Sequence, residues 1–205
     1  MKNLNNQSGR SMIEMLGVLA IIGVLSVGGI AGYSKAMMKF KINKTLDQVA
    51  MTVTNIRTMY AQQNDYVGLT DSLAISLGLV DDAMVSGTAL NTLNSPFGTF
   101  SLGVGDAGTM NANSSTGFTI TLSGIPKEAC VAIATNSWGS AFSAGFLGIG
   151  VNTSAGDCTI SSGTISGGLA CAHGAAGRSG ALIAVSDAAD ACSQAVANSI
   201  MLKYY

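Results

Sequence analysis

Charged residues are scarce in this chain. Asp, Glu, Lys and Arg together make up 10% of its 205 residues, whereas a typical soluble domain has about 25%. Apolar residues make up 48%, and Gly, Ala, Ser, Thr and Asn supply most of the remainder. Such a composition predicts a chain that is covered or packed rather than freely solvated. The length allows one ordinary domain plus an accessory element.

The few charges are unevenly distributed. Residues 1–62 contain seven Lys or Arg and only Glu14 and Asp47 as acids, whereas residues 63–205 contain three Lys or Arg and nine acids. The acidic second part excludes a basic nucleic-acid-binding domain there, and we predict no nucleic-acid partner. The basic first part fits a segment that lies at an anionic membrane surface or meets acidic neighbours.

Sequence motifs typical of catalytic and metal sites are nearly absent. His173 is the only histidine, no two cysteines have Cys-x-x-Cys spacing, and no serine stands in a Gly-x-Ser-x-Gly motif. Gly103, Gly105 and Gly108 have the spacing of a dinucleotide-binding loop, but turn-forming residues follow them and favour a hairpin over the required helix. We therefore predict no enzymatic activity, no catalytic residue, no metal and no cofactor, and we expect His173 in a loop.

Cysteine is absent before position 130. An even number of widely spaced cysteines behind a membrane-directing segment predicts two disulfides formed in an oxidising compartment. Four cysteines allow three pairings, and the residues alone do not choose among them. They are Cys130, Cys158, Cys171 and Cys192.

Proline is missing from the first 95 residues, and the segment Met12–Tyr33 lacks every charge but Glu14. At 22 residues it is long enough to cross a membrane as a helix. A cleavable secretory signal is one alternative, but this apolar core begins with an acid and no break in the helical pattern follows Gly32. A plain membrane anchor is another, but it gives Glu14 no purpose, although the carboxylate would cost about 2.5–3.5 kcal/mol at the bilayer centre and less near the interface. The carboxylate needs a partner.

An amphipathic pattern follows the apolar segment without a break. Its apolar residues recur at spacings of 4 and 3 and predict a core-facing stripe: Ile42, Leu46, Val49, Val53, Ile56 and Tyr60. The polar residues between them are expected to face water: Lys41, Lys44, Gln48, Asn55, Thr58 and Gln62. We predict one helix of about 50 residues whose first half projects and whose second half packs. Four glycines should let the first half bend or unwind locally: Gly23, Gly28, Gly29 and Gly32.

The rest of the chain reads as short helices and strands. We predict a helical piece at 72–77, strands at 97–104 and 118–122, a helix after Pro126 that carries Cys130, and a closing strand at 199–205. Ser186 should cap a last helix over 187–197 that carries Cys192.

The N-terminal motif resembles a known processing signal. A polar leader ends in Gly9, Glu14 is the fifth residue after it, and an apolar run follows, as in the class III signal of type IV pilins and related pseudopilins. In that family a membrane peptidase cuts after the glycine and methylates the new amino terminus, which here is Arg10. The resemblance implies that Glu14 attracts the free amine of Arg10 in another subunit inside an apolar filament core, where an ion pair fixes the register.

The C-terminal region is similar to that of type IVb pilins. The residues that carry the likeness are "IPKEACVAIATNSW" and, far downstream, "DACSQAVANSIMLKYY". In that subclass a disulfide delimits the variable C-terminal region and the final strand lies within an antiparallel sheet. The resemblance therefore implies the pairs Cys130–Cys192 and Cys158–Cys171.

Together these likenesses imply an α+β fold in which the second half of a long N-terminal helix packs on an antiparallel, disulfide-bonded sheet domain. The expected parts are a leader (1–9), a projecting helix that serves as membrane anchor and filament core (10–35) and a globular pilin domain (36–205). The implied function is that of a structural subunit of a type IVb-like pilus for adhesion, aggregation or conjugative contact. Alternatives are a minor pilin, a type II secretion pseudopilin or a single-span anchored binding domain.

The same likeness implies where the chain resides and what it meets. We expect a precursor in the bacterial inner membrane and then an extracellular filament. The expected partners are other copies of the chain, the prepilin peptidase, the pilus assembly machinery, the inner membrane and a host or recipient cell surface.

Overall fold

A computed structural model describes most of the chain. The described residues are 8–63, 65–87, 91–105, 116–136, 138, 145–152, 159–161, 164–166, 172–173 and 184–204. Side chains are described from Met12 onward and, beyond Asn152, only over 184–204. The chain divides into two compact units, residues 1–40 and 41–205.

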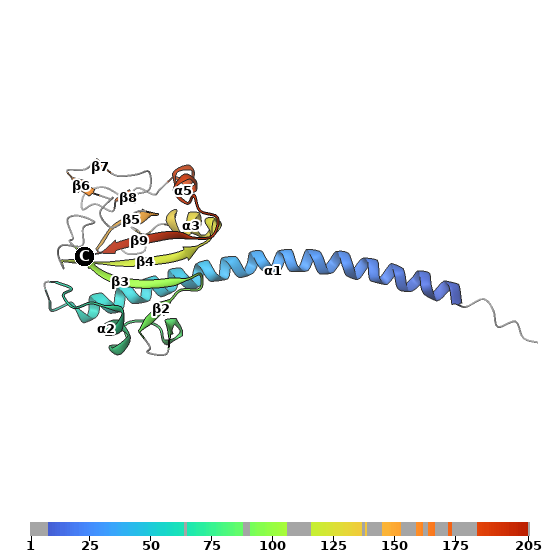
Figure 1. Cartoon of the computed structure of the whole chain (residues 1–205), viewed down its shortest axis with the longest axis horizontal. Coiled ribbons are helices and arrows are strands. Elements are labelled where there is room, and N and C mark those ends of the chain that lie inside the picture. The colour runs from blue at the N-terminus through green and yellow to red at the C-terminus, as the bar shows by residue number, and fades with distance from the viewer. Residues whose placement is uncertain are drawn as a thin grey trace, which may run out of the picture. The chain divides into compact units, whose positions relative to one another are not determined.

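The unit of residues 1–40 contains the first part of α1, a helix that covers Ser8–Met59 as one element (Figure 1). The helix runs unbroken through Gly23, Gly28, Gly29 and Gly32. The predicted single helix of about 50 residues is therefore confirmed. Local melting at the glycines stays a prediction.

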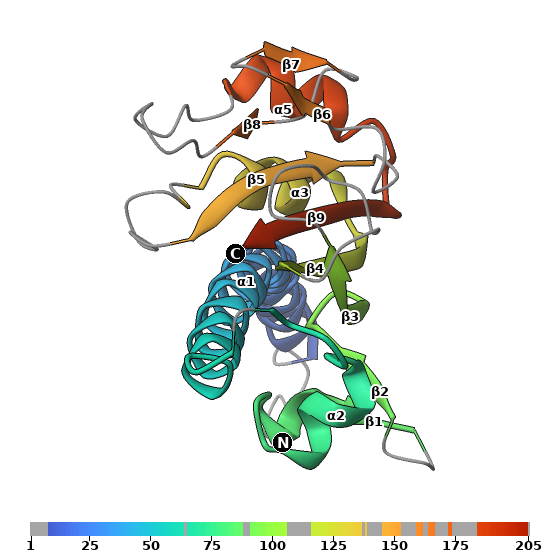
Figure 2. The same cartoon turned by 90° about the vertical axis from the view of Figure 1, so that its left-hand side faces the viewer.

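The unit of residues 41–205 is built on a seven-stranded sheet with the order β1-β2-β3-β4-β9-β5-β8, in which every neighbouring pair is antiparallel. Figure 2 shows β4, β9 and β5 side by side. The strands are β1 (Val85–Ser86), β2 (Thr92–Asn94), β3 (Thr99–Gly105), β4 (Gly117–Ile125), β5 (Phe146–Val151), β8 (Ala172–His173) and β9 (Asn198–Tyr204). A separate hairpin joins β6 (Thr159–Ser161) to β7 (Thr164–Ser166).

Short helices complete this unit. They are α2 (Asp71–Ser76), the 3-10 turn η1 (Asp82–Met84), α3 (Lys127–Ala134) and α5 (Val185–Ala191). Thr70 caps α2 by accepting a hydrogen bond from the Leu73 amide at 3.2 Å, and Gly78 ends it in the left-handed region at φ +65°. The Gly78 and Leu79 amides then donate to the carbonyls of Ile75 and Ala74, which satisfies two carbonyls at the end of the helix.

The second half of α1 packs on the sheet, as the sequence pattern predicted (Figure 1). Val49 and Ile56 are fully buried, and Val53 and Tyr60 nearly so. The expectation that Gln48 faces water is wrong, because only 6% of its surface is exposed. The buried face is broader than the apolar stripe: Thr45, Gln48 and Thr52 line its side at spacings of 3 and 4.

Side chains alternate across the central strands. Phe118, Ile120 and Leu122 of β4 are buried and pair with Tyr204, Leu202 and Ile200 of β9, which are buried as well. Thr119 and Thr121 point to the other face and are half-buried. This alternation confirms the strand predicted at 118–122 and the predicted closing strand, and the pairing places the closing strand in the middle of the sheet.

An aromatic row connects the elements of the core. The ring of Tyr66 lies 5.3 Å from that of Tyr60 and 4.8 Å from that of Phe118, and Tyr204 lies 5.4 Å from both Phe118 and Phe146. Each pair falls in the range where aromatic rings attract. Burial in this row raises the pKa of the Tyr204 hydroxyl far above its usual value. Tyr60 at the end of α1 is thereby tied to β4, β9 and β5.

The last helix differs from the prediction. Helix α5 begins at Val185 with Ala184 as its cap residue, so Ser186 lies inside the first turn and bonds the neighbouring carboxylate of Asp187 at 3.2 Å. The helix ends at Ala191, before the expected end at residue 197. His173 is also placed differently: it lies in β8 and pairs with Gly148, not in a loop.

Candidate functional site

The apolar part of α1 is exposed along its whole length in the unit of residues 1–40. It is the one stretch among the described residues that is long and apolar enough to cross a membrane, with a mean hydropathy of 2.2 and none of it buried. Exposed fractions reach 75% at Ile13 and Val24. A large exposed apolar patch marks a site of contact with a membrane or another protein. We therefore expect a membrane or another protein to cover this stretch.

The polar groups within this stretch are already satisfied by the helix. The hydroxyl of Ser26 donates to the carbonyl of Ile22 at 2.7 Å, and that of Ser34 donates to the carbonyl of Ile30 at 3.0 Å. Neither serine therefore brings an unpaired donor into an apolar environment. Between Glu14 and Lys35 the stretch has no charged side chain.

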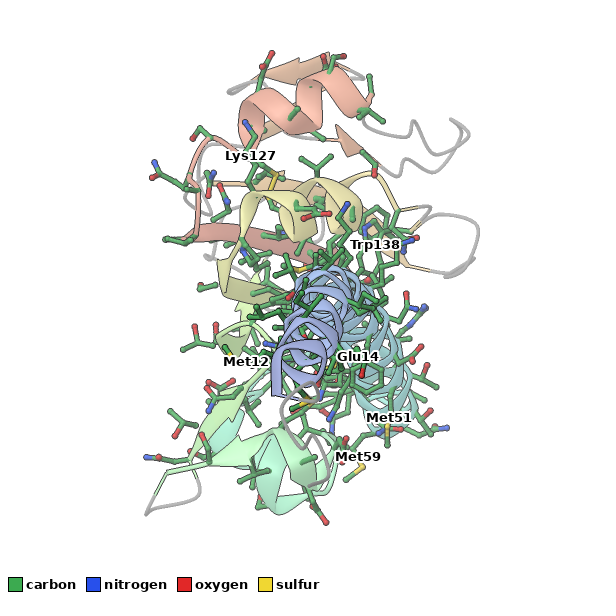
Figure 3. All side chains as sticks on the ribbon, turned by 90° about the vertical axis from the view of Figure 1, so that its right-hand side faces the viewer. Met12, Glu14, Met51, Met59, Lys127 and Trp138 are labelled. Atoms are coloured by element: carbon green, nitrogen blue, oxygen red, sulfur yellow. A yellow bond between two sulfur atoms is a disulfide. The ribbon has the colours of Figure 1, made fainter. Side chains whose placement is uncertain are left out.

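Glu14 is the exception in this stretch. It lies near the start of α1 with its side chain exposed (Figure 3). Gly9 and Arg10 lie in the first turns of the same helix, but the side chain of Arg10 is outside the described part. The proposed cleavage after Gly9 and the pairing of Glu14 with an Arg10 amine both need another protein, and they stay predictions.

The four glycines that were predicted to give flexibility share one property. A Cβ atom built at Gly23, Gly28, Gly29 or Gly32 would meet nothing within 4 Å. Nothing inside the unit of residues 1–40 therefore requires glycine at these positions. Their reason must lie in bending of the helix or in close approach by another molecule.

A disulfide joins Cys130 of α3 to Cys192 directly after α5, with the two Cα atoms 6.0 Å apart. Both residues are fully buried. The predicted long-range pair is therefore confirmed. The second predicted pair, Cys158–Cys171, lies outside the described residues.

A cluster of amide side chains lies beside this disulfide, and the sequence reasoning missed it. The buried side chain of Asn198 donates to the carbonyls of Ile125 and Gln194 at 3.0 and 2.6 Å and accepts from the Gln194 amide at 3.0 Å. Asn152, in the left-handed region at φ 52°, donates to the Asn198 oxygen at 2.8 Å and accepts from the Ser199 amide. We call these two residues the asparagine clasp.

The asparagine clasp fixes the start of the C-terminal strand. It connects the ends of β4 and β5 to the loop that leads from Cys192 into β9. A sequence signal existed, because asparagine favours left-handed backbone and local backbone hydrogen bonds. The contacts that make Asn198 a hub, however, come from residues as far as 73 positions away.

Comparison with known proteins agrees with this architecture. The model of the Bundlin family matches residues 35–205. The chain is 28% identical over 152 residues to the major structural subunit of the bundle-forming pilus of Escherichia coli O127:H6 and equally to that of Escherichia coli O111:H-, covering 74% of this chain and 74% of each relative.

A solved structure shares the fold. The type IV b pilin from Salmonella typhi matches with a TM-score of 0.51 and 22% sequence identity, covering 78% of this chain and 97% of the pilin. At this identity the likeness concerns the fold alone. The family match and the shared fold agree with the apolar helix, the antiparallel sheet and the disulfide: the chain belongs to the Bundlin family and has the type IVb pilin fold.

Proposed function

We infer that this chain is a structural subunit of a type IV pilus, which polymerises with copies of itself into an extracellular filament. The observation that carries this inference is the exposed apolar half of α1, which has no cover in its own unit. Burial of such a surface against other copies is the main favourable term available for assembly. The relatives, which are major structural subunits, favour a major over a minor pilin or a pseudopilin.

The precursor is held in the inner membrane by the same stretch. A prepilin peptidase cuts after Gly9, so that Arg10 becomes the amino terminus and receives the methyl group, and the pilus machinery then moves the subunit into the filament. This order is supported by the leader motif and by the length and hydropathy of the helix. Adhesion and aggregation fit such a filament, and a host or recipient cell surface is the expected target. A family of pilus subunits also agrees with the predicted lack of enzymatic activity.

Glu14 determines the register of assembly in this proposal. Its carboxylate meets the amine of Arg10 of a neighbouring copy inside the apolar core, where an unpaired charge would be strongly disfavoured. Because the attraction requires a carboxylate, the isosteric amide of Glu14→Gln should abolish it while still filling the same space.

The test compares filament formation with processing. Glu14→Gln should insert at least as well as the parent, since an amide costs less in lipid than a carboxylate, and should still be cut after Gly9. The yield of sheared filament per processed subunit should fall at least about tenfold, the loss expected for a charge left buried without its partner. Wild-type filament yield from Glu14→Gln would refute the assigned role of Glu14.

A further inference from the structure

A second stripe runs along α1 within the unit of residues 41–205, on the side away from the buried one. It consists of Lys44, Asp47, Met51, Thr54 and Thr58, at spacings of 3, 4, 3 and 4. Met51 is 51% exposed and projects into solvent (Figure 3). Asp47, Thr54 and Thr58 are exposed, and Lys44 is half-buried. We call this set the outward stripe.

The outward stripe is less polar than its residue types suggest. The Thr54 hydroxyl donates to the Ala50 carbonyl at 2.9 Å, and the Thr58 hydroxyl donates to the Thr54 carbonyl at 2.8 Å. Because these donors are satisfied within α1, another helix could cover the stripe without leaving a threonine donor unpaired. Met51 adds an adaptable apolar contact at the centre.

The apolar segment of the same chain carries a stripe of equal spacing. Glu14, Gly17, Ile21, Val24 and Gly28 also follow one another at 3, 4, 3 and 4. Ile21 and Val24 are 62% and 75% exposed. Added Cβ atoms at Gly17 and Gly28 would meet nothing within 4 Å, so the unit itself does not need glycine there. Glycines on one face let a second helix approach closely.

We propose that the outward stripe of one subunit binds the apolar segment of a second copy, with the two helices parallel and displaced by 30 residues. This displacement, about 45 Å along the axis at the rise of an α-helix, sets Glu14 opposite Lys44. It also sets Ile21 opposite Met51 and Val24 opposite Thr54.

Charge complementarity selects this partner and this register. Glu14 is the only acid of the apolar segment, and Lys44 is the base at the start of the outward stripe. The same displacement places Gly17 opposite Asp47, where the missing side chain leaves room for the aspartate. In a parallel pair both stripes run in the order 3-4-3-4, so every residue has a counterpart and Glu14 faces Lys44. In an antiparallel pair of the same two stripes, Glu14 would face Thr58 instead.

The inference rests on the proposed function and adds a second contact to it. A carboxylate can accept several hydrogen bonds through its two oxygens, so Glu14 can meet the Arg10 amine of one copy and Lys44 of another. Lys44 thereby becomes a residue that positions the neighbouring subunit, in addition to any contribution it makes to solubility.

Charge reversal tests the pair. Lys44→Glu should reduce sheared filament per processed subunit at least about tenfold, because it would oppose Glu14 with a like charge. Lys44→Arg should assemble like the parent, because it keeps a positive charge opposite Glu14 and leaves the Glu14 carboxylate free to meet the Arg10 amine. The matched control is Lys39→Glu, which makes the same change in net charge about 140° around the helix from Lys44 and should assemble like the parent.

Crosslinking tests the surface without relying on the charge variants. In filaments mixed with wild-type subunits, Val24→Cys combined with Thr54→Cys should yield disulfide-linked dimers. The control pairs Thr54→Cys with Ile22→Cys, which lies about 200° around the helix from Val24, and should yield far fewer.

The outcomes distinguish failure of the outward-stripe contact from failure of the proposed pilus function. Normal filaments from Lys44→Glu, with no Val24–Thr54 dimer, would overturn the outward stripe as an interface and leave the proposed function intact. A dimer found only in the membrane fraction and never in filaments would also contradict it. Absence of filaments from the wild-type chain would refute the proposed function itself.

Discussion

Asn198 is a single residue whose replacement should clearly lower the stability of the globular unit. Its fully buried side chain satisfies backbone groups of Ile125 and Gln194 and receives a hydrogen bond from Asn152. Gln194 has both its amide and its carbonyl bound to this one side chain. That local pairing competes with continuation of helix α5 and explains why the helix ends before the predicted boundary.

Asn198→Ala should therefore lower the free energy of unfolding of the globular unit by about 2–4 kcal/mol, because one buried and two part-buried backbone groups would lose their partner. Urea unfolding, followed by circular dichroism under oxidising conditions, measures this loss. The matched control is Asn55→Ala, which removes a single hydrogen bond to the Leu79 carbonyl from a half-buried position and should cost about 1 kcal/mol. Equal losses of unfolding free energy in the two variants would show that the asparagine clasp stabilises the unit no more than a single hydrogen bond does.

At the level of elements, the disulfide and the asparagine clasp both hold the segment that leads into strand β9. Cys192 lies six residues before Asn198, the first residue of β9, and Cys130 belongs to α3, which follows β4 after Pro126. The crosslink therefore spans the two segments that bracket the centre of the sheet. Closing a loop across 62 positions restricts the unfolded chain strongly.

Replacing Cys130 and Cys192 together by Ala should reduce the free energy of unfolding by about 2–5 kcal/mol. The double replacement avoids leaving one reactive thiol. Because the asparagine clasp remains, the folded variant should keep β9 in the sheet, and amide exchange of Ile200 and Leu202 would report it. Complete loss of protection at these amides in the folded variant would contradict an independent role for the clasp.

Element types were predictable where the periodicity was local. The spacing of Val49, Val53 and Ile56 indicated the packed face of α1, and the alternation around Ile120 indicated β4. The burial of Gln48 was not predictable, because the width of a helix face depends on what packs against it. The family likeness implied that the final strand lies within the sheet, which is confirmed, but its neighbours β4 and β5 were not predictable, since strand order depends on contacts far apart in sequence.

The candidate site was predictable only in part. The sequence alone singled out Glu14 as a candidate, because a charge is costly in hydrocarbon and a lone carboxylate in an apolar run therefore needs a reason. The pair Cys130–Cys192 came from a family likeness and is confirmed, whereas the spacing alone allowed three pairings. The proposed outward stripe was not predicted, because the sequence does not show that the Thr54 and Thr58 hydroxyls are hydrogen-bonded within α1.

At the scale of the whole molecule, the two halves of α1 have different tasks. Residues of the buried stripe belong to the core of the sheet domain, while the apolar half is exposed and available to contact a membrane or other subunits. A chain that begins at Ala36 should therefore be soluble and monomeric with an intact sheet, as judged by size exclusion and circular dichroism, and unable to enter filaments. Aggregation of this chain under oxidising conditions would contradict the division of tasks.

A pilus subunit matured by a cut after Gly9 must lack residues 1–9 in the filament. The most direct test is the N-terminal mass of the protein recovered from sheared filaments. We expect a polypeptide of residues 10–205 that begins at Arg10, with or without one added methyl group, and whose disulfides are intact. Filament protein that still carries Met1, or sheared fractions that lack this chain altogether while the membrane retains it, would contradict the claim.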